Sequence, residues 1–417
     1  MTQGCLTALR IPVGWTYQPL GQVCERSSQS GAGDWEPLSV FLGAGVVPRS
    51  SREDNHNQLG FDLAKNLRVA PGDLVINKLR AWQGGLGVSG HRGIVSPAYF
   101  VLRSSATLYP RYLHFLLQSK PYLSELTRLS KWMPPSQFDL PWDALKTLPV
   151  LTPPLDVQRR IADFLDDQIS RIDSILRATE QQISLLRSRE MGWLDHQMQM
   201  LGSEFGRVPL RRWITHIEQG WSPQCDSRPA DAQEAGVLKL GSVRGGRFRE
   251  QEKKAMSQDT VPVPRYAIRP RDLLVSRANT PELVGEAAVV PDDVRSQLYL
   301  CDLLYRVRTS IEEVEFISAA LRSRKSRGLL GVIARGTSQS MVKLRGEDIG
   351  NVSIPAAPTP ARRMLAAEAA TTMADSDAAV AAIQDMRTLL QERKRALITA
   401  AVTGEFDVST ASGRNIA

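Results

Sequence analysis

The stretch PPLDVQRRIADFLDDQISRID (Pro153–Asp173) opens a long helix in the interior of a 417-residue chain. Two prolines and an acidic residue that lead into an apolar-periodic run are typical of a helix start. A weaker version of the stretch, TPARRMLAAEAATTMADSD (Thr359–Asp377), begins about two hundred residues later. The two stretches predict two long helices, each of which follows a globular segment.

The segments before the two helices also repeat. DALKTLPVLTPP, from Asp143, matches EDIGNVSIPAAP, from Glu347, as a strand that ends in proline. YLHFLLQS, from Tyr112, matches FISAALRS, from Phe316, as an apolar helix, and both matches have an offset of 204 residues. Further upstream, VAPGDLVINK matches IRPRDLLVSR at an offset of 199. Internal repetition of this kind predicts the order domain, helix, domain, helix.

The repeat predicts an α+β fold with two globular α/β domains, two long helices and a pseudo-twofold internal repeat. Short β runs such as GDLVINKL and LLYRVR occur beside one or two helices in each globular segment. The predicted segments are residues 1–150 for the first domain, 151–202 for the first helix, 203–355 for the second domain, 356–407 for the second helix and 408–417 for a tail.

Both helices carry a seam of residues at the alternating spacings of three and four that a coiled coil requires. The first seam comprises Leu165, Ile169, Ile172, Leu176, Thr179, Ile183 and Leu186, and the second comprises Met373, Ser376, Val380, Ile383, Arg387 and Leu390. Since neither seam is stable when exposed and each is too narrow for a globular core, we expect the helices to pair as an antiparallel coiled coil. The alternative is that each helix packs on its own domain.

The charge distribution follows the same division. The formal net charge is +8 and the pI is near 9.4. By segment the charge is +5 for residues 1–150, −2 for 151–202, +5 for 203–355 and 0 for 356–417. The positive excess therefore lies in the two globular segments, which favours a polyanionic partner. A helix of about 38 residues spans roughly 57 Å, so paired helices carrying two basic domains would suit two half-sites on duplex DNA.

No catalytic pattern is present in the sequence. There is no Walker-type phosphate loop, no Asn/Asp-Pro-Pro-aromatic tetrapeptide and no histidine pair at metal spacing. GGLGVSG contains Gly85, Gly87 and Gly90 at dinucleotide-fingerprint spacing, but a second strand follows it instead of the helix N-terminus that would hold a pyrophosphate. We therefore expect a recognition protein without a metal or cofactor of its own.

The compartment is predicted from further absences. The four cysteines are far apart in the sequence, which predicts reduced packing residues and no disulfide framework. No apolar run approaches the length of a membrane span, and the start of the sequence does not resemble a signal peptide. The expected location is cytoplasmic.

The stretch LPVLTPPLDVQRRIADFLDDQISRID resembles the specificity (S) subunits of type I restriction-modification enzymes. In that family a motif close to P-P-L-x-x-Q-x-x-I-A-x-x-L-D opens a long spacer helix. The matching positions are Pro153, Pro154, Leu155, Gln158, Ile161, Ala162, Leu165 and Asp166. LLQERKRALITAAVTGEFD (Leu389–Asp407) resembles the closing motif of the family, and the run from Pro71 to Leu102 resembles one class of its recognition domains. The second helix start departs from the motif, because it keeps Arg362 and Arg363 but lacks the Pro-Pro-Leu and the glutamine.

This resemblance implies a DNA-recognition subunit that is not an enzyme on its own. It implies assembly with two methyltransferase (M) subunits, which use S-adenosylmethionine, and two restriction (R) subunits, which use ATP and magnesium. The S chain would read a bipartite, asymmetric sequence in double-stranded DNA, one part with each target-recognition domain. The alternatives are an S-like subunit of a nuclease-free DNA methyltransferase and a non-DNA protein scaffold.

Candidate DNA contacts are polar or basic residues in loops that leave the predicted strands. Arginine pairs with guanine, asparagine and glutamine pair with adenine, and serine and threonine contact bases or phosphate. The candidates are Lys78, Arg80, Trp82, Gln83, Lys131, Ser136 and Gln137 in the first domain, and Arg277, Asn279, Thr280, Arg335, Thr337, Ser338, Gln339 and Ser340 in the second. The alternative for each is a solvated loop side chain, and for Trp82 a core position. ALRSRKSRGLL (Ala320–Leu330) is predicted to form a basic helix surface for phosphate contact.

Overall fold

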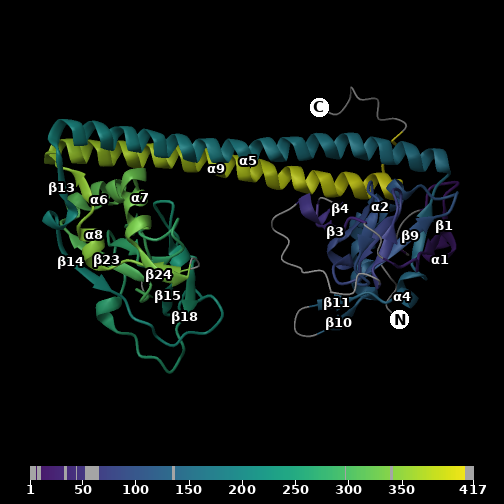
Figure 1. Ribbon diagram of the computed structural model, residues 1–417, viewed down its shortest axis with the longest axis horizontal. Coiled ribbons are helices and arrows are strands. Elements are labelled where there is room, and N and C mark those ends of the chain that lie inside the picture. The colour runs from purple at the N-terminus through teal and green to yellow at the C-terminus, as the bar shows by residue number, and fades with distance from the viewer. Residues whose placement is uncertain are drawn as a thin grey trace. The chain divides into compact units, whose positions relative to one another are not determined.

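The computed structural model of the chain describes residue 6 and residues 11–31, 35–43, 45–51, 65–133, 137–295, 297–338 and 341–408. It divides into two compact units, of which unit 1 comprises Met1–Thr179 and Gln384–Ala417 and unit 2 comprises Glu180–Ile383. Each unit contains one globular domain and one part of each of two long helices, α5 (Leu155–Phe205) and α9 (Thr359–Thr403) (Figure 1).

The first domain is built on a four-stranded antiparallel sheet in the order β2-β9-β6-β7. The strands are β2 (Cys24–Arg26), β9 (Tyr99–Ser104), β6 (Leu74–Asn77) and β7 (Leu86–Val88). Alternate residues of β6 face opposite sides, as the period of two of a strand requires. Leu74 and Ile76 join a core with α2 (Pro110–Gln118) and α3 (Lys120–Leu129), whereas Val75 faces a second, smaller core.

Short strands complete this domain. The smaller core is closed by β3 (Leu38–Phe41), β4 (Gly45–Pro48), β5 (Leu67–Val69) and β8 (Gly93–Val95). After α3 the chain forms the hairpin β10 (Lys131–Met133) and β11 (Gln137–Asp139), then α4 (Trp142–Leu145) and β12 (Pro149–Thr152), and β12 pairs with β1 (Thr16–Pro19), which precedes α1 (Leu20–Val23). The strand β12 leads directly into α5.

The second domain repeats this plan. Its central sheet has the order β14-β23-β19-β21, formed by β14 (Ile214–Gln219), β23 (Leu304–Thr309), β19 (Leu273–Ser276) and β21 (Ala287–Val289). There follow α6 (Val314–Arg322), α7 (Arg324–Ile333), β24 (Arg335–Ser338), β25 (Met341–Lys343), α8 (Gly346–Gly350) and β26 (Ser353–Pro355), which pairs with β13 (Arg207–Pro209). The remaining strands are β15 (Gly236–Leu238), β16 (Val243–Arg244), β17 (Arg247–Phe248), β18 (Lys253–Ala255), β20 (Ala278–Asn279) and β22 (Leu298–Tyr299). Short 3-10 helices are η2 (Arg49–Ser51), η4 (Ala81–Gln83), η5 (Leu210–Arg212), η6 (Leu240–Ser242), η7 (Pro264–Tyr266) and η8 (Ile311–Glu313).

The two domains correspond element by element. From α2 to α5, each helix and strand begins 204 residues before its counterpart between α6 and α9. The paired elements are α2 and α6, α3 and α7, β10 and β24, β11 and β25, α4 and α8, β12 and β26, and α5 and α9. This correspondence confirms the predicted fold class, and it means that each position from α2 to the start of α5 has an identifiable equivalent in the second domain.

The long helices pair with each other within each unit. In unit 1, Lys394 Nζ lies 2.7 Å from Asp173 Oδ1, and Arg387 contacts Thr179. In unit 2, Arg187 Nη1 donates to Ser376 Oγ at 3.1 Å. Because the residue numbers of α9 fall as those of α5 rise, the pairing is antiparallel, and Figure 1 shows the yellow-green α9 beside the teal α5.

The predicted seam positions lie along this contact. Leu165, Ile172, Val380 and Ile383 are buried. Half-buried positions are Ile169, Leu176, Ile183, Leu186, Met373 and Leu390. The helices also pack on the domains, because Ile398, Ala401 and Val402 of α9 join the core of the first domain, and Leu194 and Met198 of α5 join the core of the second.

Candidate nucleic-acid interface

The fold brings together two groups of candidate residues that are more than forty positions apart in the first domain. The ring of Trp82, in η4 after β6, lies 5.1 Å from the ring of Phe138 in β11. The amide of Leu140, just after β11, donates to the Lys78 carbonyl oxygen at 3.2 Å. The segment 78–83 and the β10–β11 hairpin therefore form one surface.

The second domain makes the equivalent arrangement. The amide of Leu344, which lies 204 residues after Leu140, donates to the Arg277 carbonyl oxygen at 2.9 Å. The strand β20, which contains Asn279, pairs with β25 of the β24–β25 hairpin. Candidate residues 277–280 and 335–338 thus share one surface as well.

Exposure separates the candidates in the first domain. Arg80, Gln83 and Lys131 are exposed, whereas Trp82 is half-buried and donates from Nε1 to the Leu79 carbonyl oxygen at 3.2 Å. Of the remaining candidates, Gln137 is described only as a backbone position in β11, and Ser136 lies outside the described residues.

In the second domain Arg335 is exposed at the start of β24. Asn279 and Thr280 are half-buried, and the Asn279 side-chain oxygen accepts from the Thr280 amide at 2.9 Å. Thr337 and Ser338 are described as backbone positions in β24, and Gln339 and Ser340 lie outside the described residues.

Lys78 and Arg277 occupy equivalent places and make equivalent contacts. Lys78 Nζ donates to the Pro97 carbonyl oxygen at 2.6 Å and lies 4.8 Å from the centre of the Phe100 ring. Arg277 Nη1 donates to the Asp302 carbonyl oxygen at 3.3 Å and lies over the Tyr305 ring. Burial, then the nearby charge of Arg26, lowers the pKa of Lys78. Both cations hold the end of a central strand to its neighbour, so each has a structural role.

Two residues of this surface escaped the sequence reasoning. Arg26 is exposed and lies 5.1 Å from the centre of the Phe100 ring, beside Lys78, although it is fifty-two residues earlier in the chain. Trp132 lies next to the candidate Lys131, in the stretch KWMPPSQFDLPW, and is 54% exposed. The unusual exposure of a tryptophan is visible only in three dimensions, because a tryptophan in a strand is ordinarily a core residue.

The predicted basic helix surface at Ala320–Leu330 is only partly correct. Arg324 and Lys325 are exposed, as expected. Arg322 is buried and donates to Glu190 Oε1 at 2.6 Å, and Arg327 is half-buried against backbone carbonyl oxygens of residues 282 and 284. Two of the four basic residues, Arg322 and Arg327, therefore do not contribute to the predicted positive surface, because they donate hydrogen bonds to acceptors within the protein.

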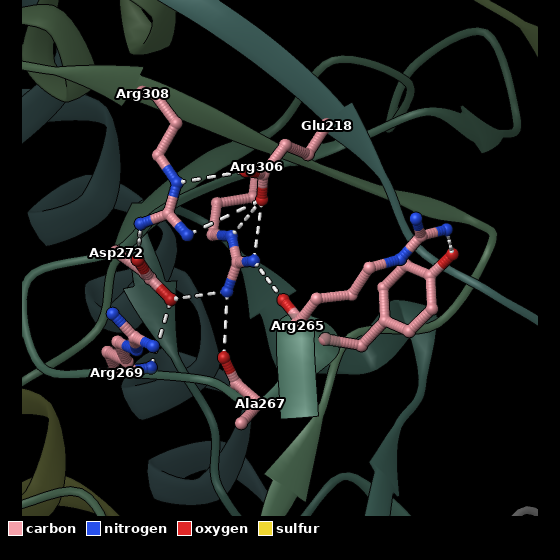
Figure 2. Close-up of polar contacts among 8 residues, drawn as sticks. Glu218, Arg265, Ala267, Arg269, Asp272, Arg306 and Arg308 are labelled. Atoms are coloured by element: carbon pink, nitrogen blue, oxygen red, sulfur yellow. Dashed lines mark hydrogen bonds and ion pairs between the residues drawn. The ribbon is translucent and has the colours of Figure 1, made fainter. Parts of the chain in front are cut away.

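An arginine is buried in the sheet of the second domain. Arg306, in β23, is 2% exposed and lies between Glu218 and Asp272 (Figure 2). Its Nε donates to Glu218 Oε2 at 2.7 Å, its Nη1 donates to Asp272 Oδ2 at 3.1 Å, and the carbonyl oxygens of Arg265 and Ala267 accept from the same guanidinium. Each donor thus has a partner, which a buried cation requires.

The carboxylates of this cluster are held by a second cation. Arg308 Nη1 donates to Asp272 Oδ1 at 2.9 Å and its Nε donates to Glu218 Oε1 at 3.3 Å. Burial acts to raise the pKa of Glu218, but hydrogen bonds and charges from Arg306 and Arg308 hold it below its ordinary value. In the first domain the equivalent of Arg306 is Val101, so the buried arginine belongs to the second domain alone, whereas the pair of Asp272 and Arg308 has a counterpart in Asp73 and Arg103, 3.6 Å apart.

A further ionic network ties the second domain to both helices within unit 2. Glu190 of α5, 5% exposed, accepts from Arg322 of α6 at 2.6 Å and from Arg247 of β17 at 2.8 Å. Arg247 also donates to Asp377 of α9 at 2.7 Å, and Arg187 lies 2.7 Å from the same carboxylate. One domain is thereby fixed to α5 and α9 through hydrogen-bonded charges.

The two helix starts use different residues for the same contact. Gln158 is fully buried, and its amide nitrogen donates to the Pro153 carbonyl oxygen at 2.8 Å while its oxygen accepts from the Tyr109 amide at 2.7 Å. Arg362, 204 residues later, donates to the Ala357 carbonyl oxygen at 2.8 Å and forms an ion pair with Glu313. Ala357 and Glu313 are the equivalents of Pro153 and Tyr109, so the second start retains the contact that the missing glutamine would have made.

The glycine-rich stretch that begins at Gly85 leads into strands and not into a helix. Gly85 and Gly87 lie at β7, which pairs with β6, and the strand β8 follows, so no helix N-terminus is available there.

In the described part of the chain, Cys24, Cys225 and Cys301 are free; Cys5 lies outside it. Within the same ranges no helix combines the length and apolarity that crossing a membrane requires, and no three His, Cys, Asp or Glu side chains gather to hold a metal ion.

These features define a class of protein: two related α/β domains, each followed by a long helix, with the helices paired antiparallel. No protein-family model matches the chain. A solved structure titled "Structural basis underlying complex assembly and conformational transition of the type I R-M system" has the same fold, with a TM-score of 0.65, 16% identity, and coverage of 95% of this chain and 100% of that one.

Two curated proteins are similar to the chain in sequence. The EcoEI specificity subunit of Escherichia coli is 29% identical over 149 residues, which are 35% of this chain and 25% of that protein, so the match spans about a quarter of the relative. The EcoKI specificity subunit of Escherichia coli strain K12 is 23% identical over 384 residues, 82% of this chain and 79% of that protein. The resemblance found at the first helix start is confirmed, and the chain is a relative of the type I restriction enzyme specificity subunits.

Proposed function

We propose that the chain is the sequence-specific DNA-binding subunit of a type I restriction-modification complex. In this proposal it reads a bipartite, asymmetric target and positions methyltransferase and restriction subunits. The observation that carries the proposal is the duplication of one surface, with exposed Arg80 and Lys131 in the first domain and exposed Arg335 in the second. Two similar cationic surfaces on two domains suit two different half-sites.

The proposal assigns different roles to the candidate residues. Arg80, Gln83, Lys131 and Arg335 are exposed, so we propose them as direct contacts; Arg335 lies 4.0 Å from Asp348 and would exchange this carboxylate for DNA. Lys78, Arg277 and Trp82 are engaged with the protein and are proposed to position the loops. Ser136, Gln137, Asn279, Thr280, Thr337, Ser338, Gln339 and Ser340 remain proposed contacts of the same loops.

Catalysis belongs to other chains in this proposal. The methyltransferase subunits would bring S-adenosylmethionine, and the restriction subunits would bring ATP and magnesium. We propose two of each, acting with this chain in the cytoplasm. The chain itself would supply the target specificity of the complex.

A domain exchange tests the proposal. Residues 1–150 are replaced by the corresponding domain of another specificity subunit, and the methylated sequence is read by methylome sequencing of cells that also express the methyltransferase subunit. One half of the methylated sequence should change while the other half is retained. The reciprocal exchange of residues 203–355 is the matched control and should change the other half. A change of both halves in either chimera would contradict the modular proposal.

Salt dependence separates DNA recognition from a protein scaffold. Binding through phosphate contacts weakens steeply as salt rises, because counterions are released on binding. A mobility-shift titration of the chain with its methyltransferase subunits, on target and unrelated duplexes at several salt concentrations, should show a steep slope and a preference for the target. An equal affinity for both duplexes at every salt concentration would favour the scaffold.

The lengths of α5 and α9 are proposed to set the unread spacer between the half-sites. Adding two helical turns to both helices, in the Leu176–Leu186 region of α5 and at the equivalent place in α9, should lengthen that spacer or abolish methylation. An unchanged methylated sequence in an active complex would exclude this role for the helices.

A further inference from the structure

An exposed tryptophan lies on the proposed DNA-binding surface of the first domain. Trp132 of β10 is 54% exposed, whereas the other tryptophans are buried or half-buried. The same hairpin in the second domain has Gly336 at the equivalent position of β24, 204 residues later. Because that hairpin forms with a glycine there, the hairpin fold does not require the indole ring.

The ring is supported from behind by two others. The centres of the Trp132 and Phe138 rings are 5.0 Å apart, and those of Phe138 and Trp82 are 5.1 Å apart. Trp82 is fixed in turn by its hydrogen bond to the Leu79 carbonyl oxygen. The ring planes are inclined, by 64° for Trp132 and Phe138 and by 53° for Phe138 and Trp82. The equivalent of Phe138 in the second domain is Val342, so this cluster of three rings occurs in the first domain alone. Aromatic pairs at these distances attract each other, so the contact with Phe138 restricts the motion of the Trp132 ring.

The surroundings of the ring indicate its partner. Lys131, the residue before Trp132 in β10, is exposed on the opposite face of the strand, and Arg80 is exposed on the adjoining segment. Cations attract the phosphate backbone, and an exposed apolar ring on the same domain has a matching surface in the face of a base pair. Apolar wedges of this kind enter duplex DNA by partly unstacking one base step, and the energy of unstacking is recovered through contacts.

We propose that Trp132 inserts between two adjacent base pairs of the half-site that the first domain reads. The ring would unstack one base step, with Phe138 and Trp82 as its rigid support and Lys131 at the flanking phosphate. The second domain, with Gly336 and Val342 at these positions, leaves its half-site stacked. This inference rests on the proposed DNA-binding function and adds a sequence-dependent distortion to it.

The test uses the full chain in complex with its methyltransferase subunits and duplexes that carry 2-aminopurine at successive positions of each half-site, other than the adenines that the methyltransferase subunits flip out to methylate. The fluorescence of 2-aminopurine rises when the base is unstacked. The wild-type complex should raise the 2-aminopurine fluorescence severalfold at one base step of the first half-site and at no step of the second. Trp132→Ala should abolish the rise and weaken target binding by about tenfold, since one base-aromatic stack contributes energy of this order. Trp132→Phe should retain part of both effects.

Matched variants distinguish the possible failures. Met341→Ala removes an exposed apolar side chain, 42% exposed, from the equivalent hairpin of the second domain and should leave the fluorescence of the first half-site unchanged. Target binding without any rise, or a rise that persists in Trp132→Ala, would overturn the wedge and leave the proposed function intact. Loss of methyltransferase subunits from the Trp132→Ala complex would overturn the wedge and indicate that Trp132 contacts a methyltransferase subunit instead. Equal affinity of the wild-type complex for target and unrelated duplexes would overturn the proposed function itself.

Discussion

The guanidinium Nη1 of Arg387, in α9, lies 2.9 Å from the hydroxyl oxygen of Thr179, in α5. The same nitrogen donates to the Leu176 carbonyl oxygen at 2.6 Å. Thr179 is 4% exposed, so this polar contact lies within the helix seam of unit 1. A polar residue in a seam lowers stability but favours one register, because only one alignment brings donor and acceptors together.

We therefore expect Arg387→Ala to lower the free energy of unfolding of unit 1 by about 1.5–3 kcal/mol, the range for a hydrogen bond of a charged group. Urea unfolding followed by circular dichroism measures the change. Arg393→Ala, an exposed arginine of the same helix, is the control and should have little effect. A double-mutant cycle with Thr179→Val should give a clear coupling energy. Additive effects of the two substitutions would contradict the contact.

The two helix starts give a second prediction. Gln158→Ala leaves the part-buried Tyr109 amide and the Pro153 and Thr107 carbonyl oxygens without their partner. At about 1–3 kcal/mol for each of the first two, with little added for Thr107 because it is exposed to water, the loss is roughly 2–6 kcal/mol. The loss should appear as a lower thermal midpoint of unit 1.

At the second start, Arg362→Gln keeps a donor for the Ala357 carbonyl oxygen but removes the cation that faces Glu313, whose side chain is 13% exposed. The single variant should be destabilised, and the double variant Arg362→Gln, Glu313→Gln should recover part of the loss, because the buried charge is then removed as well. If the double variant unfolds at a lower temperature than the single one, the ion pair with Glu313 does not explain the presence of an arginine at position 362.

The sequence predicted the long-range order of the fold because that order depends on periodicity and repetition. The spacing from Leu165 to Leu186 specified a helix seam, and the offset of 204 residues relates the elements from α2 to α5 to those from α6 to α9. The second helix start showed what such patterns miss. Its loss of glutamine indicated a degenerate motif, yet Arg362 reaches the equivalent carbonyl oxygen with a longer side chain.

The candidate site was less predictable, because its contacts join distant positions. Loop residues 78–83 were found by their place after a strand, but their contact with the hairpin at Phe138 depends on folding. Arg322 looked like a surface cation within a basic run, and only the structure places Glu190 next to it. In each case the missing information was the identity of a partner more than fifty residues away.

The buried Arg306 gives a third prediction. Arg306→Met leaves Glu218 and Asp272 with one cation in place of two, and an uncompensated buried charge costs about 3–5 kcal/mol. Unit 2 should therefore unfold at a markedly lower urea concentration. Arg308→Met is the matched control, and since Arg308 is 34% exposed it should cost less. Equal effects of the two substitutions would mean that burial does not determine how much each arginine contributes to the stability of unit 2.

His114 gives a pH-dependent prediction for unit 1. Burial, followed by the charges of Arg111 and Lys394, lowers the pKa of His114 to about 3. The unfolded chain takes up a proton near the ordinary histidine pKa of about 6.5, whereas the folded chain does not until the pH is much lower. Stability should thus fall as the pH is lowered from about 6.5 toward 3, and His114→Leu should flatten this part of the curve.

The measurement is the thermal midpoint of unit 1 at successive pH values between neutrality and moderate acidity. His196→Leu, at an exposed position of α5, should leave the pH dependence unchanged. A wild-type midpoint that stays constant through this range, with native structure intact, would contradict a buried neutral His114.

Lys131 and Arg335 begin equivalent strands of the two hairpins, and both are exposed. If each contacts one phosphate, Lys131→Ala or Arg335→Ala should reduce the slope of log affinity against log salt by about one and weaken binding to target and unrelated DNA alike. Gln83→Ala should leave the slope unchanged but reduce discrimination at one position, because glutamine reads a base edge and neutralises no charge. Mobility-shift titrations of each variant at several salt concentrations, on the target and on single-base variants of it, separate these outcomes. A reduced slope for Gln83→Ala, or an effect of Lys131→Ala confined to one base pair, would reverse the assignment of backbone and base contacts.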